Sequence, residues 1–129
     1  MGLTFDAGAL IGLERARHVM RKVFAAATAH DVPITVPAVV VAEWWREGRR
    51  EKQRAAILRA VQVEPLTDYV ARLAGVALTR VPSATTVDAL VMASAAQRPG
   101  EVVYTSDVGV LEVLRQGVRE FRHLRILAA

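Results

Sequence analysis

The chain alternates short apolar runs with longer stretches of helical periodicity, and this alternation constrains its fold more than any other feature. Strand-like runs lie at Leu3–Phe5, Ile34–Val36 and Glu101–Tyr104, with a weaker run at 61–63 and an alternating tail at 121–127 that we expect to be an edge strand. Strands that alternate with helices predict βαβ units and a parallel sheet. We therefore expect an α/β fold.

The helices are expected in the stretches between these strands. Apolar residues recur at helical spacing from Leu10 to Ala27, with Arg17 as a break in the stripe, and His30-Asp31 ends this pattern. Further helices are expected at about 38–50, 50–61, 69–80, 85–97 and 108–116. The chain shows no linker or internal repeat, so residues 1–129 are expected to form a single domain.

Composition narrows the class of protein. Hydrophobic residues make up 53% of the chain, enough for a folded core, and cysteine is absent, which rules out disulfides and thiolate metal sites. The longest apolar runs, such as 36–42, are too short to cross a bilayer, and the N-terminus has no basic region typical of a signal peptide. We therefore expect a cytoplasmic protein with no membrane partner.

The basic residues are nearly all arginine. The formal charge is +4, and of the 17 basic residues only Lys22 and Lys52 are lysine. Arginine suits phosphate recognition, although codon usage in a GC-rich genome explains the bias equally well. One group could track RNA phosphates or form a solvated helix surface, namely Arg46, Arg49, Arg50 and Arg54.

Four of the 13 acidic residues fall where a parallel sheet would bring them together. Asp6 directly follows the first strand, and Asp107 follows the Glu101–Tyr104 strand within three residues. Asp88 lies in the first turn of its helix, and Glu43 lies about two turns into the helix after the second strand. Strand carboxyl ends and helix N-termini meet at the same edge of such a sheet, where ligand sites form. We therefore expect these four carboxylates to share one crevice.

Four carboxylates in one crevice require a cation, because close carboxylates raise each other's pKa unless a positive charge joins them. Oxygen ligands suit Mg²⁺ or Mn²⁺, which lower the pKa of a bound water and clamp the oxygens of a phosphodiester. We expect Asp6, Asp88 and Asp107 to be metal ligands. Glu43 would hold a second ion, orient a water or act as a base.

Each of these residues alone also has an ordinary interpretation. Asp6 and Asp107 suit helix N-caps. Thr85 followed by Asp88 resembles a capping box, and Glu43 could pair with a surface arginine. The conjunction favours a site, because Glu43 and Asp88 are embedded in apolar stretches where carboxylates are rarely left unpaired.

Four segments also resemble those of a known protein family. They are Asp6-Ala7-Gly8-Ala9-Leu10-Ile11-Gly12-Leu13-Glu14, Val36-Pro37-Ala38 with Ala42-Glu43, Val87-Asp88-Ala89-Leu90-Val91-Met92-Ala93-Ser94-Ala95, and Tyr104-Thr105-Ser106-Asp107. In this order and spacing they resemble a PIN domain, and more narrowly the VapC-type toxins of bacterial type II toxin–antitoxin systems. The resemblance covers essentially the whole chain. It implies a three-layer α/β/α sandwich with a parallel sheet of about five strands.

The resemblance also implies an activity, a site and partners. The activity is an endoribonuclease that depends on Mg²⁺, with Mn²⁺ able to substitute, and hydrolyses RNA with a metal-activated water. The family's acidic positions carry over to Asp6, Glu43, Asp88 and Asp107 as catalytic and metal-binding residues, and Thr105 is implied to hold a metal-bound water. The implied partners are an RNA substrate of the tRNA or rRNA class, a cognate VapB-like antitoxin and a second copy of the chain in a homodimer.

The chain departs from the family pattern at two positions. Many relatives carry another acid where this chain has Val110, and Ser or Thr where it has Ala7. A catalytically weak or inactive PIN-like module that binds or regulates therefore remains an alternative, as does a nuclease that acts on DNA. A receiver-like signalling domain is disfavoured, because the chain has no lysine beyond Lys52 to contact a phosphoryl group.

Three further residues lie near the expected site. Trp44 and Trp45 point in different directions from a helix, so one is expected in the core and the other beside a groove for an antitoxin helix or a partner subunit. Glu14 could reach the rim of the crevice, but we expect it on the surface.

Overall fold

Five short strands form one all-parallel sheet in the computed structural model, which describes residues 1–129. The strands are β1 (Leu3–Phe5), β2 (Ile34–Pro37), β3 (Gln62–Glu64), β4 (Val102–Thr105) and β5 (Arg125–Ala128). Their order across the sheet is β3-β2-β1-β4-β5. All five predicted strands are therefore present, and the tail strand lies at an edge as expected.

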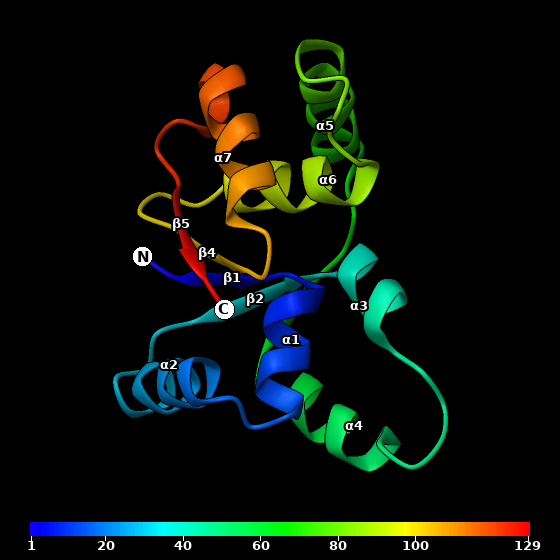
Figure 1. The fold of residues 1–129 in the computed structure, drawn as a ribbon, viewed down its shortest axis with the longest axis vertical. Coiled ribbons are helices and arrows are strands. Elements are labelled where there is room, and N and C mark those ends of the chain that lie inside the picture. Colours follow the sequence, from blue (N-terminus) through cyan, green and yellow to red (C-terminus); the bar gives the residue numbers. More distant parts are fainter.

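Seven α-helices and one 3₁₀ turn connect the strands. They are α1 (Ala7–Glu14), α2 (His18–Ala29), α3 (Ala38–Trp44), α4 (Glu51–Arg59), α5 (Asp68–Arg80), α6 (Thr86–Ala95), α7 (Val108–Gly117) and the turn η1 (Arg119–Phe121). Helices α5, α6 and α7 pack together on one face of the sheet, while α1, α2 and α4 lie on the other (Figure 1). This is the predicted α/β/α sandwich.

The layering explains why the central strands are mostly apolar and almost entirely buried. All four residues of β2 are buried, since helices cover both faces of a parallel sheet. Phe5, Val36 and Val103 are completely buried at the centre of the core. No helix is both long enough and apolar enough to span a membrane.

A polar network joins three of the strands beneath α6. The Arg98 guanidinium donates to Thr4 Oγ1 at 2.9 Å and to Glu101 Oε2 at 2.8 Å, and it also pairs with Glu64. Thr4 Oγ1 donates in turn to Glu101 at 2.5 Å. Glu101 Oε2 thus has a charged and a neutral partner, whereas its buried Oε1 has no hydrogen-bond partner.

The first predicted helix is in fact two. α1 ends at Glu14 and α2 begins at His18, with Ala16 at a φ of 52° between them. The Arg17 N–H donates to Gly12 O at 2.8 Å, which closes the end of α1. A Cβ on Gly12 would lie 2.9 Å from Met20 Cγ, so this glycine lets α2 fold back closely on α1. The polar break that Arg17 makes in the apolar stripe marks the turn.

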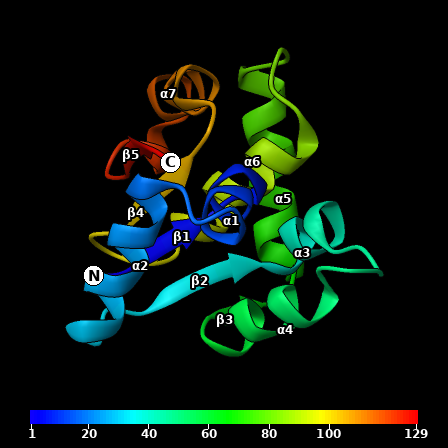
Figure 2. The same cartoon turned by 60° about the horizontal axis from the view of Figure 1, so that its bottom comes forward.

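The second predicted helix is shorter than expected. α3 ends at Trp44 rather than at Arg50, because Trp45 is extended, with φ −64° and ψ 134°. The Arg46 side chain donates to the carbonyl oxygens of Ala42 and Trp45, and Gly48 takes a φ of 126° in the loop that follows. Figure 2 shows this loop as an open arm between α3 and α4.

The strand order creates a crevice next to β1. After β1 the chain moves outward through β2 and β3, and it then crosses back to place β4 on the other side of β1. In open parallel sheets, ligands bind at the carboxyl ends of the strands where the order reverses in this way. Asp6 follows β1 and Asp107 follows β4, so the two loops that border the crevice each carry an acid.

Candidate active site

A pocket of about 620 Å³ opens at this edge of the sheet, and all four predicted carboxylates line it. Asp6 comes from the loop after β1, Glu43 from the last turn of α3, Asp88 from the first turn of α6, and Asp107 from the loop after β4. Segments more than 100 residues apart in sequence therefore contribute to one cavity, with Asp6 at one extreme and Asp107 at the other.

Asp6 is held by the end of its own strand and the start of α1. Its main-chain N–H donates to Tyr104 O of β4 at 3.3 Å, and its Oδ1 accepts from Ala9 N–H at 2.9 Å as the cap of α1. Burial raises the pKa of Asp6, and the charge of Asp88 adds to the rise. Hydrogen bonds from Thr105 and Ala9 act in the opposite direction without cancelling it. Asp6 is thus an N-cap and a member of the acidic group at once.

Asp88 and Glu43 lie across the pocket from Asp6. Thr85 Oγ1 accepts the Asp88 N–H at 3.1 Å, which confirms the predicted cap and leaves the Asp88 carboxylate free of hydrogen bonds within the protein. Burial raises the pKa of Glu43, and the charges of Asp88 and Asp6 raise it further. These three carboxylates therefore lie near enough to affect one another's ionisation.

Asp107 and Thr105 belong to the loop after β4. Asp107 occupies the N-cap position of α7, but its side chain caps nothing; its N–H donates to Thr105 Oγ1 at 2.9 Å. Thr105 is buried and does not line the pocket, but it lies near enough to Asp6 to lower the pKa of that carboxyl. Thr105 is therefore close to both acid-bearing loops, and its role toward a metal-bound water stays a prediction.

Two solved structures share this architecture over nearly their whole length. A DNA-bound VapBC from Salmonella typhimurium matches with a TM-score of 0.70 and 15% identity, covering 99% of this chain and 98% of that one. VapBC2 from Rickettsia felis, bound to a DNA fragment from their promoter, matches with a TM-score of 0.74 and 11% identity, covering 100% and 99%. This chain therefore shares its fold with a chain of each of these VapBC assemblies. No protein-family model and no curated protein matches the sequence.

The carboxylates that line this pocket fit a hard divalent cation by their donor chemistry. They offer carboxylate oxygens alone, the ligands that Mg²⁺ and Mn²⁺ prefer, and a cation would relieve the repulsion that raises two of the pKa values. As the side chains stand, no group of three or more acidic or histidine residues forms a set that could hold one ion. Glu43 and Asp107 are exposed, and exposed side chains change rotamer within nanoseconds.

The pocket lining is also basic, which the sequence indicated only in part. Its lining includes four arginines, namely Arg15, Arg46, Arg50 and Arg54. Three of these were noted as a possible phosphate track, but Arg49 of that group does not line the pocket. The sequence analysis assigned no role to Arg15 or Ser106, although Arg15 directly follows the first recognised segment and Ser106 lies within the last.

Glu14 was expected on the surface rather than at the rim of the crevice, and that prediction is wrong, because Glu14 is buried and lines the pocket. It is only 5% exposed and accepts hydrogen bonds at 3.0 Å from Trp44 Nε1, Arg50 Nη1 and Arg54 Nε. Burial opposes its ionisation, but the hydrogen bonds from Arg54, Arg50 and Trp44 outweigh burial and lower the pKa of Glu14. Gln53 also donates to the Glu14 main-chain oxygen at 2.6 Å. This contact set joins the end of α1 to α3 and α4.

The two tryptophans divide as predicted. Trp44 is 4% exposed and packs in the core, with the Arg54 guanidinium 5.5 Å from its ring. Trp45 is only half-buried and meets Trp44 edge to face, with ring centroids 6.5 Å apart. The role of Trp45 beside a partner groove stays a prediction.

Proposed function

We propose that this chain is a Mg²⁺- or Mn²⁺-dependent endoribonuclease and the toxin of a VapBC-type toxin–antitoxin pair. One observation carries the proposal: carboxylates from four separate segments line one pocket at the point where the strand order reverses. The VapC-type fold agrees with it, because both structural neighbours are VapBC assemblies.

In the proposed reaction, Asp6, Asp88 and Asp107 would hold the cation, and Glu43 would hold a second ion or orient the attacking water. The cation would supply a more acidic bound water and charge stabilisation at the scissile phosphodiester. Thr105 positions the Asp107 loop by accepting the Asp107 N–H at its hydroxyl. The capped start of α6 fixes Asp88 against the pocket, and Trp44 anchors the helical turn that bears Glu43.

The proposed partners follow from the proposed function as a VapBC-type toxin. The substrate is RNA, of the tRNA or rRNA class, and the protein acts in the cytoplasm. A cognate VapB-like antitoxin would inhibit it, as the neighbouring VapBC assemblies suggest. A homodimer is proposed as the working form.

RNA cleavage tests the activity directly. Purified protein should cut total bacterial RNA in Mg²⁺ or Mn²⁺ and stop when EDTA is added. Asp6→Asn keeps an equally good helix cap but removes a charged ligand worth several kcal/mol of transition-state stabilisation, so cleavage should fall at least ~100-fold. Cleavage that persists in EDTA would rule out the mechanism.

Metal binding can be measured without turnover. Mg²⁺ should raise the Tm of the wild type, by an amount that corresponds to about 2.7 kcal/mol at one hundred times its Kd. Asp6→Asn should abolish most of this increase. The control is Asp68→Asn, which alters an aspartate on the exposed start of α5 and should leave the metal effect intact.

One observation favours a second candidate, a PIN-like module that binds or regulates without cutting. No set of three acidic side chains stands ready to hold an ion. Val110, where many relatives carry an acid, lines a separate small pocket with Val81 and Val113. For such a module, the wild type would show neither metal-dependent stabilisation nor cleavage, yet would still bind RNA or a protein partner.

A further inference from the structure

Both carboxylates and arginines line the pocket. The arginines differ in whether they pair with an acidic residue of the protein. Of the four arginines that line the pocket, two bind a carboxylate of the protein. Arg50 Nη1 and Arg54 Nε each lie 3.0 Å from a different oxygen of the buried Glu14 carboxylate. These two guanidinium groups share that one negative charge, which holds them in place and offsets part of their attraction for a ligand.

The other two arginines have no acidic partner. Arg15, exposed at the end of α1, makes no side-chain hydrogen bond or ion pair within the protein. Arg46 uses Nη1 to donate to the oxygens of Ala42 at 3.3 Å and Trp45 at 2.5 Å. Those two contacts fix the Arg46 guanidinium against the end of α3 but leave Nη2 and Nε without partners in the protein.

Free guanidinium groups beside a carboxylate site fit one kind of ligand well. A nucleic-acid strand presents regularly spaced phosphates. If one phosphate lies at the carboxylates and their cation, the next phosphates along the strand lie a few ångströms away in each direction. The arginine fork binds such phosphate oxygens in pairs. A pocket of about 620 Å³ is of a size that encloses a small-molecule ligand, which suits a flexible single strand better than a rigid duplex.

We propose that Arg15 and Arg46 form a clamp for the backbone phosphates that flank the scissile phosphate of a single-stranded RNA, while Arg50 and Arg54 serve the structure. This assignment rests on the proposed nuclease function for the position of the scissile phosphate. Arg15 and Arg46 are not expected to affect metal binding, because neither arginine contacts the carboxylates of the pocket.

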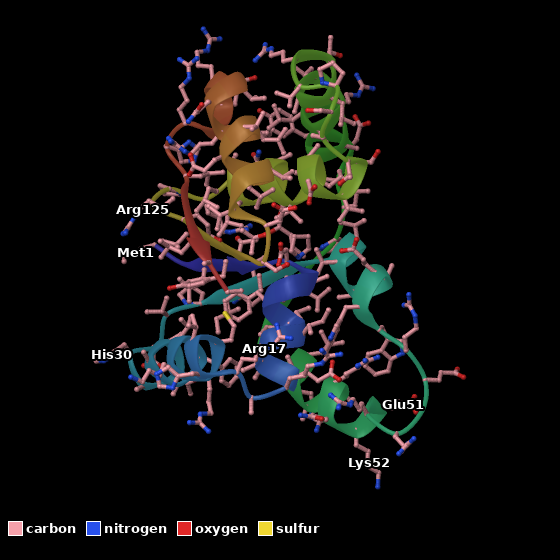
Figure 3. The ribbon with its side chains drawn as sticks, in the orientation of Figure 1. Met1, Arg17, His30, Glu51, Lys52 and Arg125 are labelled. Carbon is pink, nitrogen blue, oxygen red and sulfur yellow. The ribbon has the colours of Figure 1, made fainter.

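Salt dependence of RNA binding separates a phosphate clamp from general charge. The probe is a fluorescein-labelled, mixed-sequence single-stranded RNA of about 12 nucleotides, measured by anisotropy with Asp6→Asn as the background to prevent cleavage. The test variant adds R15A and R46A. The matched control adds R122A and R125A, which remove the same charge beside the amino end of β5, where Arg125 pairs in register with the start of β4. Figure 3 shows Arg125 pointing away from the molecule, on the side opposite α3.

Each lost phosphate contact should reduce the slope of log K against log salt by about 0.7 for a single strand, so the test variant should lose about 1.4. The control should keep the slope of its parent. Equal slopes in the two variants, or no RNA binding by the parent at low salt, would overturn the clamp.

The failure of the clamp is distinguishable from failure of the proposed function. With Asp6 restored, the R15A/R46A protein should keep the full Mg²⁺-dependent rise in Tm, and its cleavage should show a raised KM with a smaller change in kcat. If cleavage and the metal effect persist with an unchanged salt slope and KM, the clamp is wrong and the nuclease stands. If the wild type shows neither metal effect nor cleavage, the nuclease proposal fails whatever the slopes are.

Discussion

Glu14 is the residue whose environment differs most from what its sequence position suggests. It follows the apolar segment Ala9–Leu13 as an acid commonly does at a helix surface, yet three donors from Trp44, Arg50 and Arg54 surround its carboxylate. The loss of a buried carboxylate that has a full set of donors strongly destabilises the folded protein, because its former partners are left desolvated and unpaired.

Glu14→Ala should therefore lower the free energy of unfolding by about 3–5 kcal/mol. The matched control is Glu112→Ala, since Glu112 also pairs with an arginine, Arg115, but on the partly exposed side of α7. Loss of that surface pair should cost less than about 1 kcal/mol. Urea unfolding of the three proteins measures both values, and similar losses for the two variants would contradict the assigned role of Glu14.

The lowered pKa of Glu14 also predicts a pH dependence. A carboxylate whose pKa is lower in the folded state stabilises the protein above its unfolded-state pKa, and this contribution disappears as the pH falls through the folded-state pKa. The difference in unfolding free energy between the wild type and Glu14→Gln should thus be largest near neutral pH and shrink in acid. A gap that widens on acidification would reverse the assigned sign.

At the scale of elements, helix starts place much of the site. α5 and α6 both begin after a threonine whose Oγ1 accepts the N–H three residues on, at 3.2 Å for Thr67 and 3.1 Å for Thr85. The two caps are chemically alike, but only the one at Thr85 belongs to the helical turn that carries Asp88.

Thr85→Ala and Thr67→Ala should each lower stability by about 1 kcal/mol, as the loss of an N-cap does. Only Thr85→Ala should also weaken the Mg²⁺-dependent rise in Tm, because fraying of the first turn of α6 displaces Asp88. Thermal melts with and without Mg²⁺ separate the two effects. An equal change in the metal effect for both variants would show that the cap does not position the acid.

The same scale shows how far the sequence alone reaches. Apolar runs and helical periodicity predict all five strands and place the four acids at one edge, since strand direction and chain order fix which loops lie there. Local signals do not predict that α3 stops at Trp44, because the stop depends on the Arg46 side chain and the Gly48 loop. Nor do they predict the burial of Glu14. Its arginine partners are Arg50, which lies 36 residues away just before α4, and Arg54, which lies 40 residues away in α4.

At the scale of the whole molecule, the site depends on the contact between the loops that follow β1 and β4. Gly8, in the first turn of α1, lies so close to Ser106 that a Cβ there would be 2.1 Å from Ser106 Oγ and 2.6 Å from its Cβ. Any side chain at residue 8 would push apart the loops that carry Asp6 and Asp107.

Gly8→Ala should therefore lower both stability and Mg²⁺ affinity, with a stability loss of about 1–3 kcal/mol that is typical of overpacking. Adding Ser106→Gly removes the two nearest clashing atoms and should restore part of both losses. The control is Gly75→Ala in α5, where a Cβ meets nothing within 4 Å and the change should be neutral or stabilising. If the double variant recovers neither stability nor Mg²⁺ affinity, the losses in Gly8→Ala do not arise from the contact with Ser106.

This contact has a consequence for natural variation in such proteins. Position 8 and position 106 share one small volume although 98 positions separate them in the chain. A larger residue at one of them is tolerated only when the other shrinks. Across homologous sequences the residues at positions 8 and 106 should thus covary. The segment that carries Asp6 and the segment that carries Asp107 should therefore change together.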